Sequence, residues 1–257
     1  MPAEEASAAI VLRARDYSES DRIVTLLTRD FGKLGGIAKG AKASRRRFER
    51  KLEPFSHAML YFRRRPHGQL VFITRAEASA ELRPFNIDDD LGKIALGSYM
   101  LELTEALTSE GAEAGGAYRV LEEALWTVSE RGAGLALRQG FELKFLRWAG
   151  FGLEFARCRQ CAAATAEDAP AYFIVSRGGI VCARCRPGVP EGALRLEGQS
   201  AVSLARLAEL SLADAHDTRP AGADAALAIS RFLSSVLDRR LRSAAFVDSV
   251  LPGGSRA

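Results

Sequence analysis

Four cysteines carry the most specific chemistry in this sequence. They form two Cys-x-x-Cys pairs, Cys158 with Cys161 and Cys182 with Cys185, and twenty residues separate the pairs. Each pair can fold into a tight turn that aims two thiolates at one ion, and two such pairs are typical of a tetrahedral zinc site. Because four thiolates leave no open coordination position, we expect one structural Zn²⁺ and no metal-bound substrate.

Redox-active cysteines and a pair of disulfides are the alternatives to a metal. A thioredoxin-type site needs one Cys-x-x-Cys in a different local context, and disulfides are rare in a reducing cytoplasm. The apolar runs 172–175 and 178–181 predict a hairpin that brings the second pair back to the first. Four arginines flank the pairs and can offset the negative charge of a Zn(Cys)₄ centre or contact nucleic acid: Arg157, Arg159, Arg184 and Arg186.

A dense run of cations lies between the third and fourth predicted strands. Residues 33–51 contain eight Lys and Arg against one acid, Glu49. Small residues separate several of these cations, which favours a loop over a helix face. Cations that contact phosphates release counterions, so such a segment can bind nucleic acid without reading its sequence. The alternative is a solvated loop. The candidate DNA-binding residues are Lys39, Lys42, Arg45, Arg46, Arg47, Arg50 and Lys51.

Aromatic residues near these cations could provide surfaces on which bases stack. Phe48 lies inside the basic run, and Tyr61 and Phe62 are available if either side chain faces outward. A basic groove with an aromatic platform is the usual way in which OB barrels bind single strands. A second basic run, residues 63–65, could extend the same track.

Composition and charge limit the classes of protein to consider. The chain has 257 residues, of which 47% are hydrophobic, and this suits one large domain or two smaller ones. Residues 1–83 contain 17 Lys and Arg against ten Asp and Glu, whereas the remainder contains 19 against 22. A basic front part favours a polyanionic ligand. We expect a cytoplasmic protein, because the sequence shows neither a membrane span nor a secretory signal.

The hydrophobic patterns change near residue 84. Before it, short apolar runs predict five strands, at residues 10–17, 22–28, 33–39, 56–63 and 69–75, which suit a five-stranded OB barrel. Gly35 and Gly36 suggest a bulge or a tight bend in the third strand. After it, helical spacing predicts helices at residues 91–108, 117–130, 135–149 and 224–241. We therefore expect an OB-fold domain over 1–83, a helical domain over 84–251 with a zinc knuckle at 156–187, and a flexible tail over 252–257.

Several segments resemble the RecO family of recombination mediators. The likeness is most specific at residues 11–24, at Phe31–Gly32–Lys33 through Lys39–Gly40–Ala41–Lys42, and at Leu52–Glu53–Pro54–Phe55. The order of barrel, helical body and inserted Cys-x-x-Cys pairs also matches, and the resemblance extends over essentially the whole chain. It implies an α+β, multidomain protein: an N-terminal five-stranded OB-fold β-barrel, then a mostly α-helical domain with an inserted Cys₄ zinc knuckle.

The same resemblance implies a non-catalytic function in DNA repair and homologous recombination. Such proteins bind single- and double-stranded DNA, anneal complementary strands and, with RecR, load RecA onto DNA coated by single-strand-binding protein. The resemblance also implies a nucleoid-associated location and binding of that protein's acidic, apolar C-terminal tail. A chemically suitable place for the tail is Arg239, Arg240 and Arg242 beside Leu241 and Phe246; charge compensation at a helix C-terminus is the alternative use of these arginines.

Other functional classes have less support in the sequence. His57, His67 and His216 show no H-x-x-x-H spacing, and residues 32–40 lack the pattern of a phosphate-binding loop, so no enzyme is indicated. A transcription factor would need a recognition helix, but Pro187 and Pro190 interrupt the chain after Cys185. An RNA-binding or ribosome-associated protein with an OB barrel and a zinc ribbon would use the same basic segment, and this alternative stays open.

Overall fold

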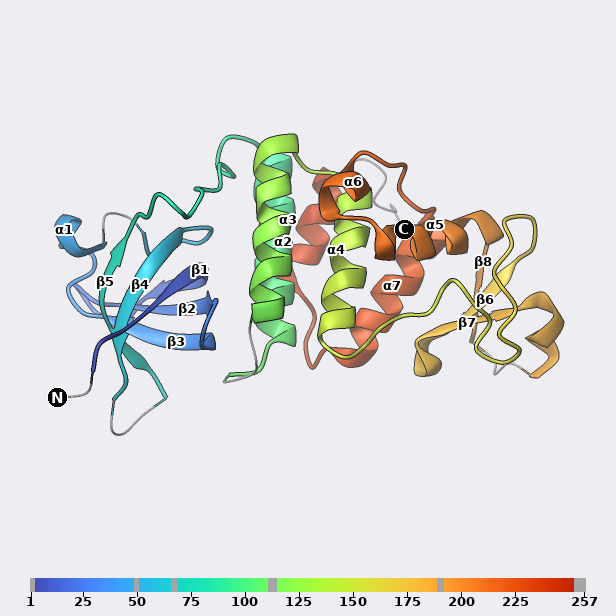
Figure 1. Cartoon of the computed structure of the whole chain (residues 1–257), viewed down its shortest axis with the longest axis horizontal. Coiled ribbons are helices and arrows are strands. Elements are labelled where there is room, and N and C mark those ends of the chain that lie inside the picture. Colours follow the sequence, from blue (N-terminus) through green and yellow to red (C-terminus); the bar gives the residue numbers. More distant parts are fainter. Residues whose placement is uncertain (1–2, 49–50, 66–68, 111–114, 189–191, 252–257) are drawn as a thin grey trace. The chain divides into compact units, whose positions relative to one another are not determined.

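The structure is a computed structural model, and its contacts divide the chain into two compact units, residues 1–130 and 131–257 (Figure 1). It describes residues 3–48, 51–65, 69–110, 115–188 and 192–251, without the side chains of Arg45 and Arg46. The domain bounds expected from the sequence stay a prediction, and the expected tail at 252–257 lies outside the described residues.

A closed β-barrel forms the first part of the first unit. Its strands in the described residues are β1 (Glu5–Asp16), β2 (Arg22–Thr28), β3 (Gly32–Ala38), β4 (His57–Arg63) and β5 (Val71–Glu77). They follow one another around the barrel in the order β1-β2-β3-β5-β4, and β3 pairs with β5 in parallel. This is the arrangement of a five-stranded OB fold, so the predicted barrel is confirmed.

The barrel closes because β1 bends and because β3 carries small residues. A bulge between Val11 and Arg13 bends β1, which pairs with β4 before it and with β2 on both sides of it. No register shift occurs at Gly35 or Gly36. Instead, a Cβ atom at Gly36 would lie 2.6 Å from the Cδ1 atom of Ile73 on β5. The two glycines therefore allow close packing. Of the bulge and the tight bend that the sequence suggested there, the bulge is absent.

The barrel has a continuous apolar core. Alternate side chains of each strand point inward, and the segment between β3 and β4 adds two more. The buried residues of this core are Ala9, Val11, Val24, Leu26, Leu34, Ala38, Phe48, Leu52, Leu60, Phe62, Val71, Ile73 and Ala76. Burial of this much apolar surface is the main source of the barrel's stability.

Two helices complete the first unit: α2 (Leu91–Leu107) and α3 (Gly115–Arg131), whose last residue begins the second unit. The Asp90 side chain caps α2 by accepting a hydrogen bond of 2.9 Å from the backbone N–H of Lys93. His57 of β4 links the barrel to α3, because its Nε2 atom lies 2.6 Å from the hydroxyl oxygen of Tyr118.

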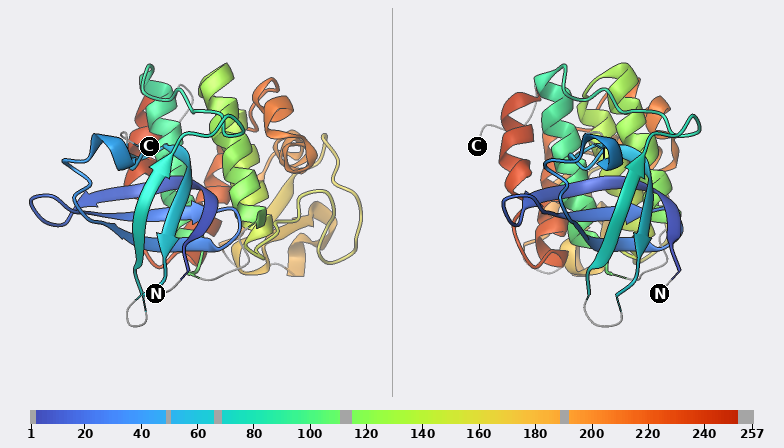
Figure 2. Two further views of the ribbon diagram at one scale, coloured as in Figure 1. Left: turned by 60° about the vertical axis from the view of Figure 1, so that its left-hand side comes forward. Right: turned by 90° about the vertical axis from the view of Figure 1, so that its left-hand side faces the viewer.

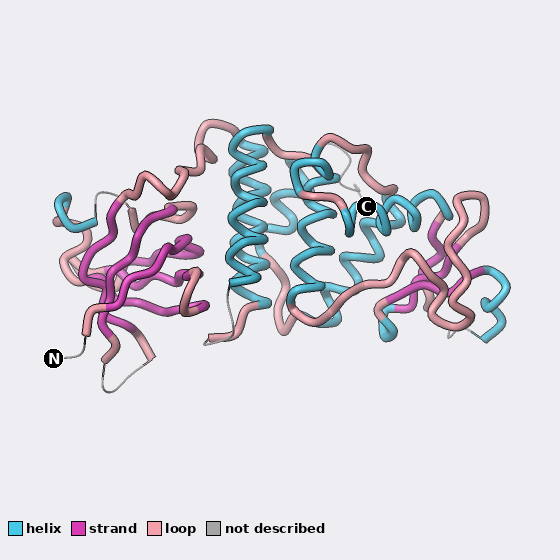
Figure 3. The backbone as a smooth tube through the Cα atoms, viewed as in Figure 1, coloured by secondary structure: helices cyan, strands magenta, loops and turns pink. Residues whose placement is uncertain are grey.

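The second unit combines helices with a small antiparallel sheet (Figure 3). Its described helices are α4 (Leu135–Trp148), α5 (Gly198–Glu209), α6 (Leu212–His216), α7 (Ala223–Val236) and α8 (Arg242–Val250), with 3₁₀ turns η1 (Val175–Arg177) and η2 (Ala183–Gly188). The sheet contains β6 (Ala171–Ile174), β7 (Gly179–Cys182) and β8 (Leu194–Leu196), in the order β7-β6-β8. Together with the barrel, these elements confirm the predicted α+β fold.

The last predicted helix is shorter than expected. Residues 224–241 were expected to form one helix, but α7 ends at Val236 and Leu237 is extended. The apolar spacing continues at Val236, Leu237 and Leu241, but these side chains are only half-buried, so little packing holds the chain in a longer helix. Leu241 instead precedes α8, which the sequence patterns did not predict.

Among the described helices, none is long and apolar enough to cross a bilayer.

Candidate nucleic-acid interface and metal centre

The basic segment, residues 39–51, connects β3 to β4 at one end of the barrel (Figure 2). It contains one short helical turn, α1 (Arg45–Phe48), where the sequence favoured an irregular loop. The hydroxyl oxygen of Ser44 accepts a hydrogen bond of 3.3 Å from the backbone N–H of Arg47, which starts this turn.

Specific contacts fasten the basic segment to the turn between β1 and β2. The backbone N–H of Lys42 donates to the carbonyl of Ser20 over 3.1 Å, and Lys42 Nζ lies 2.8 Å from the carboxylate of Asp16. The hydrogen bond from Lys42 holds the pKa of Asp16 below its usual value, although partial burial acts in the opposite direction. Farther along, Arg47 donates to the carbonyl of Lys39 over 2.9 Å. These contacts therefore hold the backbone that carries the cations in one conformation.

Most of the predicted DNA-binding side chains that can be described face solvent. Lys39, Lys42 and Arg47 are exposed, and Lys51 is half-buried. The backbone of Arg45 and Arg46 lies in α1, whereas Arg50 lies outside the described residues. The structure brings these positions together in one segment; their contact with DNA remains a prediction.

The aromatic residues expected to stack bases are placed differently from the expectation. Phe48 is only 2% exposed and belongs to the barrel core, and Phe62 is fully buried. Tyr61 is half-buried, and the guanidinium of Arg75 covers its ring at 3.5 Å. Phe48 is buried because α1 turns this apolar side chain inward, so it anchors the basic segment and presents no stacking surface.

The second basic run has acidic partners. Arg63 and Arg64 lie 3.9 and 3.0 Å from the carboxylates of Glu4 and Glu5, at the start of the strand paired with β4, which begins at Glu5. Arg75 also contacts Glu4, at 3.0 Å. These ion pairs offset part of the positive charge of this run, and its part in binding DNA stays a prediction.

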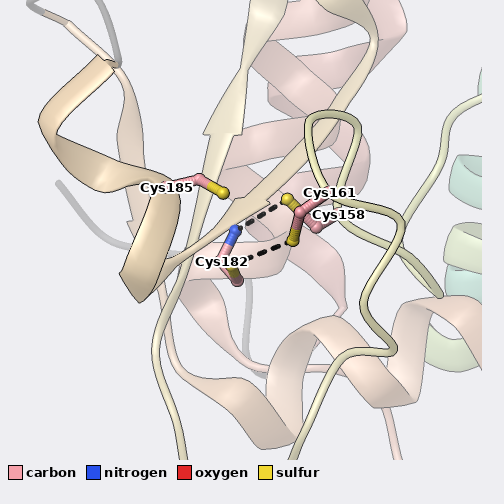
Figure 4. Close-up of side chains that lie close together, drawn as sticks. All are labelled: Cys158, Cys161, Cys182 and Cys185. Atoms are coloured by element: carbon pink, nitrogen blue, oxygen red, sulfur yellow. Dashed lines mark hydrogen bonds between the residues drawn. The ribbon is translucent and has the colours of Figure 1, made fainter.

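The four cysteines lie together in what we call the four-cysteine module, residues 156–187. Their sulfur atoms all lie within 4.8 Å of one another and face a common point (Figure 4). Cys158 and Cys161 come from the loop after α4, while Cys182 ends β7 and Cys185 lies in η2. The predicted hairpin of β6 and β7 is confirmed, and it carries the second pair back to the first. No disulfide links the cysteines. The module can hold a metal ion.

Backbone N–H groups donate hydrogen bonds to the cysteine sulfurs and so favour their thiolate form. Those of Gln160 and Cys182 each donate to the Sγ atom of Cys158 over 3.4 Å. A hydrogen bond from the backbone of Ala163, assisted by Arg184, lowers the pKa of Cys161 to about 6. Burial, with the nearby sulfurs, raises the pKa of Cys185 to about 12. One thiol is thus ionised at neutral pH, and another keeps its proton until a cation displaces it.

The flanking arginines have local roles. Arg184 lies 3.7 Å from the Cys161 sulfur, as expected for charge compensation. Arg157 and Arg159 donate to the carbonyls of Ala162 and Gly178 over 3.4 Å each, and the guanidinium of Arg186 lies over the ring of Tyr172.

Comparisons with known proteins identify the family. The model of the Recombination protein O N-terminal domain matches residues 1–81, and that of its C-terminal domain matches residues 88–246. The chain belongs to the RecO family. "DNA repair protein RecO" of Anaeromyxobacter dehalogenans strain 2CP-C is 37% identical over 247 residues, which cover 95% of both chains. The protein of the same name in Symbiobacterium thermophilum is 33% identical over 248 residues, covering 94% of this chain and 95% of its own.

The RecO helical unit also contains an apolar groove that sequence reasoning missed. Its volume is about 690 Å³, and its lining includes Phe151, Ile174, Val175, Arg177, Phe232 and Val236. Residues from α7, β6 and η1 meet there, so no single stretch of sequence marks it.

Arg239, Arg240 and Arg242, which the sequence offered as a place for a peptide tail, follow the end of α7. Arg242 begins α8, and α7 has no basic residue in its last turn, so compensation at the C-terminus of that helix is not the role of these arginines.

Proposed function

We propose that this RecO-family protein is a mediator of DNA repair and homologous recombination. It binds single- and double-stranded DNA, anneals complementary strands and, together with RecR, helps load RecA onto DNA coated by single-strand-binding protein. The names of the relatives support the repair function. The observation that carries the DNA-binding part is the basic segment, whose exposed Lys39, Lys42 and Arg47 are fastened to one end of an OB barrel.

Annealing by this protein involves no bond chemistry. Two DNA strands repel each other through their phosphates, and cations that neutralise both backbones lower that repulsion. The exposed cations of the basic segment supply this charge without reading the bases. The protein works at the nucleoid in the cytoplasm, where its DNA ligand is found.

The ion held by the module is Zn²⁺. Four thiolates are the ligand set of structural zinc, and Zn–S bonds of about 2.3 Å in a tetrahedron put the sulfurs about 3.8 Å apart. The Sγ atoms of Cys161 and Cys182 are 3.7 Å apart, which fits that geometry. With all four positions filled by protein sulfur, the ion contributes to folding and takes no direct part in DNA binding.

The partner tail binds the groove of the helical unit. The C-terminal tail of single-strand-binding protein is apolar and acidic, so it requires an apolar surface with a cation beside it. Phe151 and Phe232 supply the apolar surface, and Arg177 is exposed on the lining. The competing proposal of an RNA-binding protein rests on the same basic segment, and a direct comparison of RNA with DNA separates the two.

A salt titration tests the DNA-binding proposal. The test variant changes Lys39, Lys42, Arg45, Arg46 and Arg47 to Ala, and the matched control changes Arg157, Arg184 and Arg186 of the module to Ala. Fluorescent single-stranded DNA, duplex DNA and RNA of equal length are titrated at several salt concentrations. Each lost phosphate contact lowers the slope of log K against log salt by about 0.7 on single strands.

The proposal predicts a steep slope for the wild type and a slope about three units smaller for the test variant. Affinity should fall by roughly 100-fold or more at low salt, whereas the control stays within about threefold of wild type. Equal binding by all three proteins would mean that the basic segment is a solvated surface. A preference for RNA over DNA would support the ribosome-associated alternative.

A further inference from the structure

Tyr17 is the exposed aromatic side chain of the barrel. At 63%, it is the most exposed large hydrophobic residue in the described part of the chain. It lies in the turn that joins β1 to β2, directly after Asp16. Among the described residues of the first unit, every other aromatic side chain is buried or half-buried. An exposed ring alone is ordinary on a protein surface, so its surroundings decide whether it has a use.

The backbone around Tyr17 is held in one conformation. The N–H of Tyr17 donates to the carbonyl of Asp21 over 3.0 Å, and the N–H of Asp21 donates to the hydroxyl of Ser18 over 3.1 Å. The carboxylate of Asp21 then accepts a hydrogen bond of 2.9 Å from the N–H of Gly40. These bonds close the turn and join it to the start of the basic segment, so the backbone that carries the Tyr17 ring is held in place.

The ring and the cations lie at the same end of the barrel. Lys42 reaches both neighbours of Tyr17: its Nζ atom lies 2.8 Å from the carboxylate of Asp16 and 3.3 Å from the carbonyl of Ser18. The hydrogen bonds of Asp21 and of the Lys42 backbone bring Lys39 and Lys42 to this turn. Figure 2 shows the β1–β2 turn, in blue, beside the chain that leads to α1.

We propose that Tyr17 stacks against a nucleobase of single-stranded DNA whose phosphates contact the basic segment. This inference rests on the proposed DNA-binding function and adds the residue that makes the site prefer single strands. A base in a duplex is already stacked on both faces, so it cannot use the ring, whereas a base of a single strand can. Stacking is tolerant of sequence because every base has an aromatic face.

Three oligonucleotides of equal length separate the two kinds of contact. A thymine strand offers phosphates and bases, an abasic strand offers phosphates alone, and a duplex offers phosphates with its bases hidden. The zinc-loaded full chain is compared as wild type, Tyr17→Ala, Tyr17→Trp and the five-cation variant. Leu91→Ala is the matched control, because Leu91 is 59% exposed and belongs to α2 rather than to the barrel.

The inference predicts that Tyr17→Ala binds the thymine strand about 5- to 100-fold more weakly, the range expected for one lost stacked base. Its affinity for the abasic strand and the duplex, and its salt slope, should match those of wild type. Tyr17→Trp should retain the affinity, and its indole fluorescence should be quenched by the thymine strand and not by the abasic strand.

The outcomes separate this inference from the proposed function. If Tyr17→Ala binds all three oligonucleotides as wild type does while the five-cation variant does not, the stacking role is wrong and the DNA-binding segment stands. If Tyr17→Ala weakens all three equally, the residue acts on the segment as a whole and the stacking role is again wrong. If wild type binds none of the three, both proposals are wrong.

Discussion

The barrel and the four-cysteine module are both small β structures, but they obtain their stability from different sources. The described part of the barrel buries thirteen core residues, including Phe62 and Ile73. The cluster around the cysteines contains three buried residues, Cys158, Ile174 and Val181, with several half-buried neighbours. Phe173 of the hairpin is also buried, but it packs against Phe155 and Phe232 outside the module. On our proposal that the module holds zinc, metal ligation adds to this small core.

Both regions carry exposed cations that also have local partners. In the barrel, Lys42 pairs with the carboxylate of Asp16 and Arg47 donates to a backbone carbonyl, whereas Lys39 is exposed. In the module, the exposed Arg184 contacts a cysteine sulfur and the exposed Arg186 covers an aromatic ring. The comparison teaches that the density and exposure of Lys and Arg do not by themselves distinguish a DNA-binding segment from charge compensation at a cysteine cluster.

The largest effect is expected on removal of the metal. Cys158→Ala deletes the sulfur that accepts two backbone hydrogen bonds, and it should abolish zinc binding. Structural zinc contributes roughly 10 kcal/mol or more to the folding of small zinc domains, so the module should unfold. Trypsin should then cleave within residues 156–187, while hydrogen exchange in the barrel strands stays unchanged. Loss of protection in the barrel would show that the two regions are not independent.

Acid should release the metal through the same sulfurs. Protons and the metal ion compete for the same four sulfurs, so ligation by thiolates is lost when the pH is low enough to protonate them. Zinc should therefore be retained at neutral pH and released progressively as the pH is lowered, as measured by a colorimetric chelator. An amount of bound zinc that does not change with pH down to strong acid would contradict thiolate ligation.

The next effect concerns the barrel core. Phe62→Ala and Phe48→Ala should each destabilise the barrel by about 3–5 kcal/mol, because both rings are buried. Phe48→Ala should also weaken DNA binding, since Phe48 anchors the basic segment, whereas zinc content should not change. Hydrogen exchange in the barrel strands measures the first effect. Phe151→Ala, in the exposed groove of the second unit, is the control.

A smaller effect is expected from His57. The Nδ1–H group donates to the carbonyl of Arg83 over 2.9 Å, so Nε2 accepts from the hydroxyl of Tyr118 and the ring is neutral. Burial lowers the pKa of His57 below its usual 6.5, although Glu122 opposes this shift. The unfolded chain thus takes up a proton more readily, and the stability from this group is complete above pH 6.5 and declines below it.

His57→Phe tests this origin of the pH dependence. The variant keeps a ring to stack on Phe85, but it leaves the Tyr118 hydroxyl without its acceptor, at a cost of about 1–3 kcal/mol. Its barrel stability should vary less between pH 7.5 and 5.5 than that of wild type. An unchanged pH dependence would mean that other groups titrate in this range.

The smallest effect is expected for Arg184→Ala. The guanidinium lies 3.7 Å from the Cys161 sulfur and is not itself a metal ligand. Its loss should therefore weaken zinc affinity by only roughly tenfold. Competition with a chelator measures the change. DNA affinity should remain that of wild type, and a large loss of DNA binding would assign this arginine to the interface.

Patterns carried by neighbouring residues were sufficient to predict much of this structure. The strands of the barrel follow short apolar runs, and the spacing of Cys158, Cys161, Cys182 and Cys185 predicted a cluster that the fold assembles. The helix predicted from residue 91 begins there as α2, and Asp90 caps it. These features depend on local periodicity and spacing, which a sequence displays directly.

Features that depend on packing were missed. Whether Phe48 points outward or inward is decided by α1 and by space in the barrel core, and its position among cations suggested the wrong answer. The glycines of β3 suggested a bulge or a tight bend, and the sequence did not show that Gly36 makes room for Ile73 from another strand. The use of Tyr17 depends on Gly40 and Lys42, which are distant in sequence and reach its turn only in the fold.

Photo-crosslinking of the zinc-loaded chain to a single strand that carries 5-iodouracil tests the division between barrel and module most directly. Mass spectrometry of the adducts locates the contacts without any substitution. The account predicts adducts in peptides from residues 13–51, with Tyr17 as a principal site, and none in residues 156–187. Adducts mainly in the four-cysteine module would contradict it, because they would place the DNA on the region that we assign to folding.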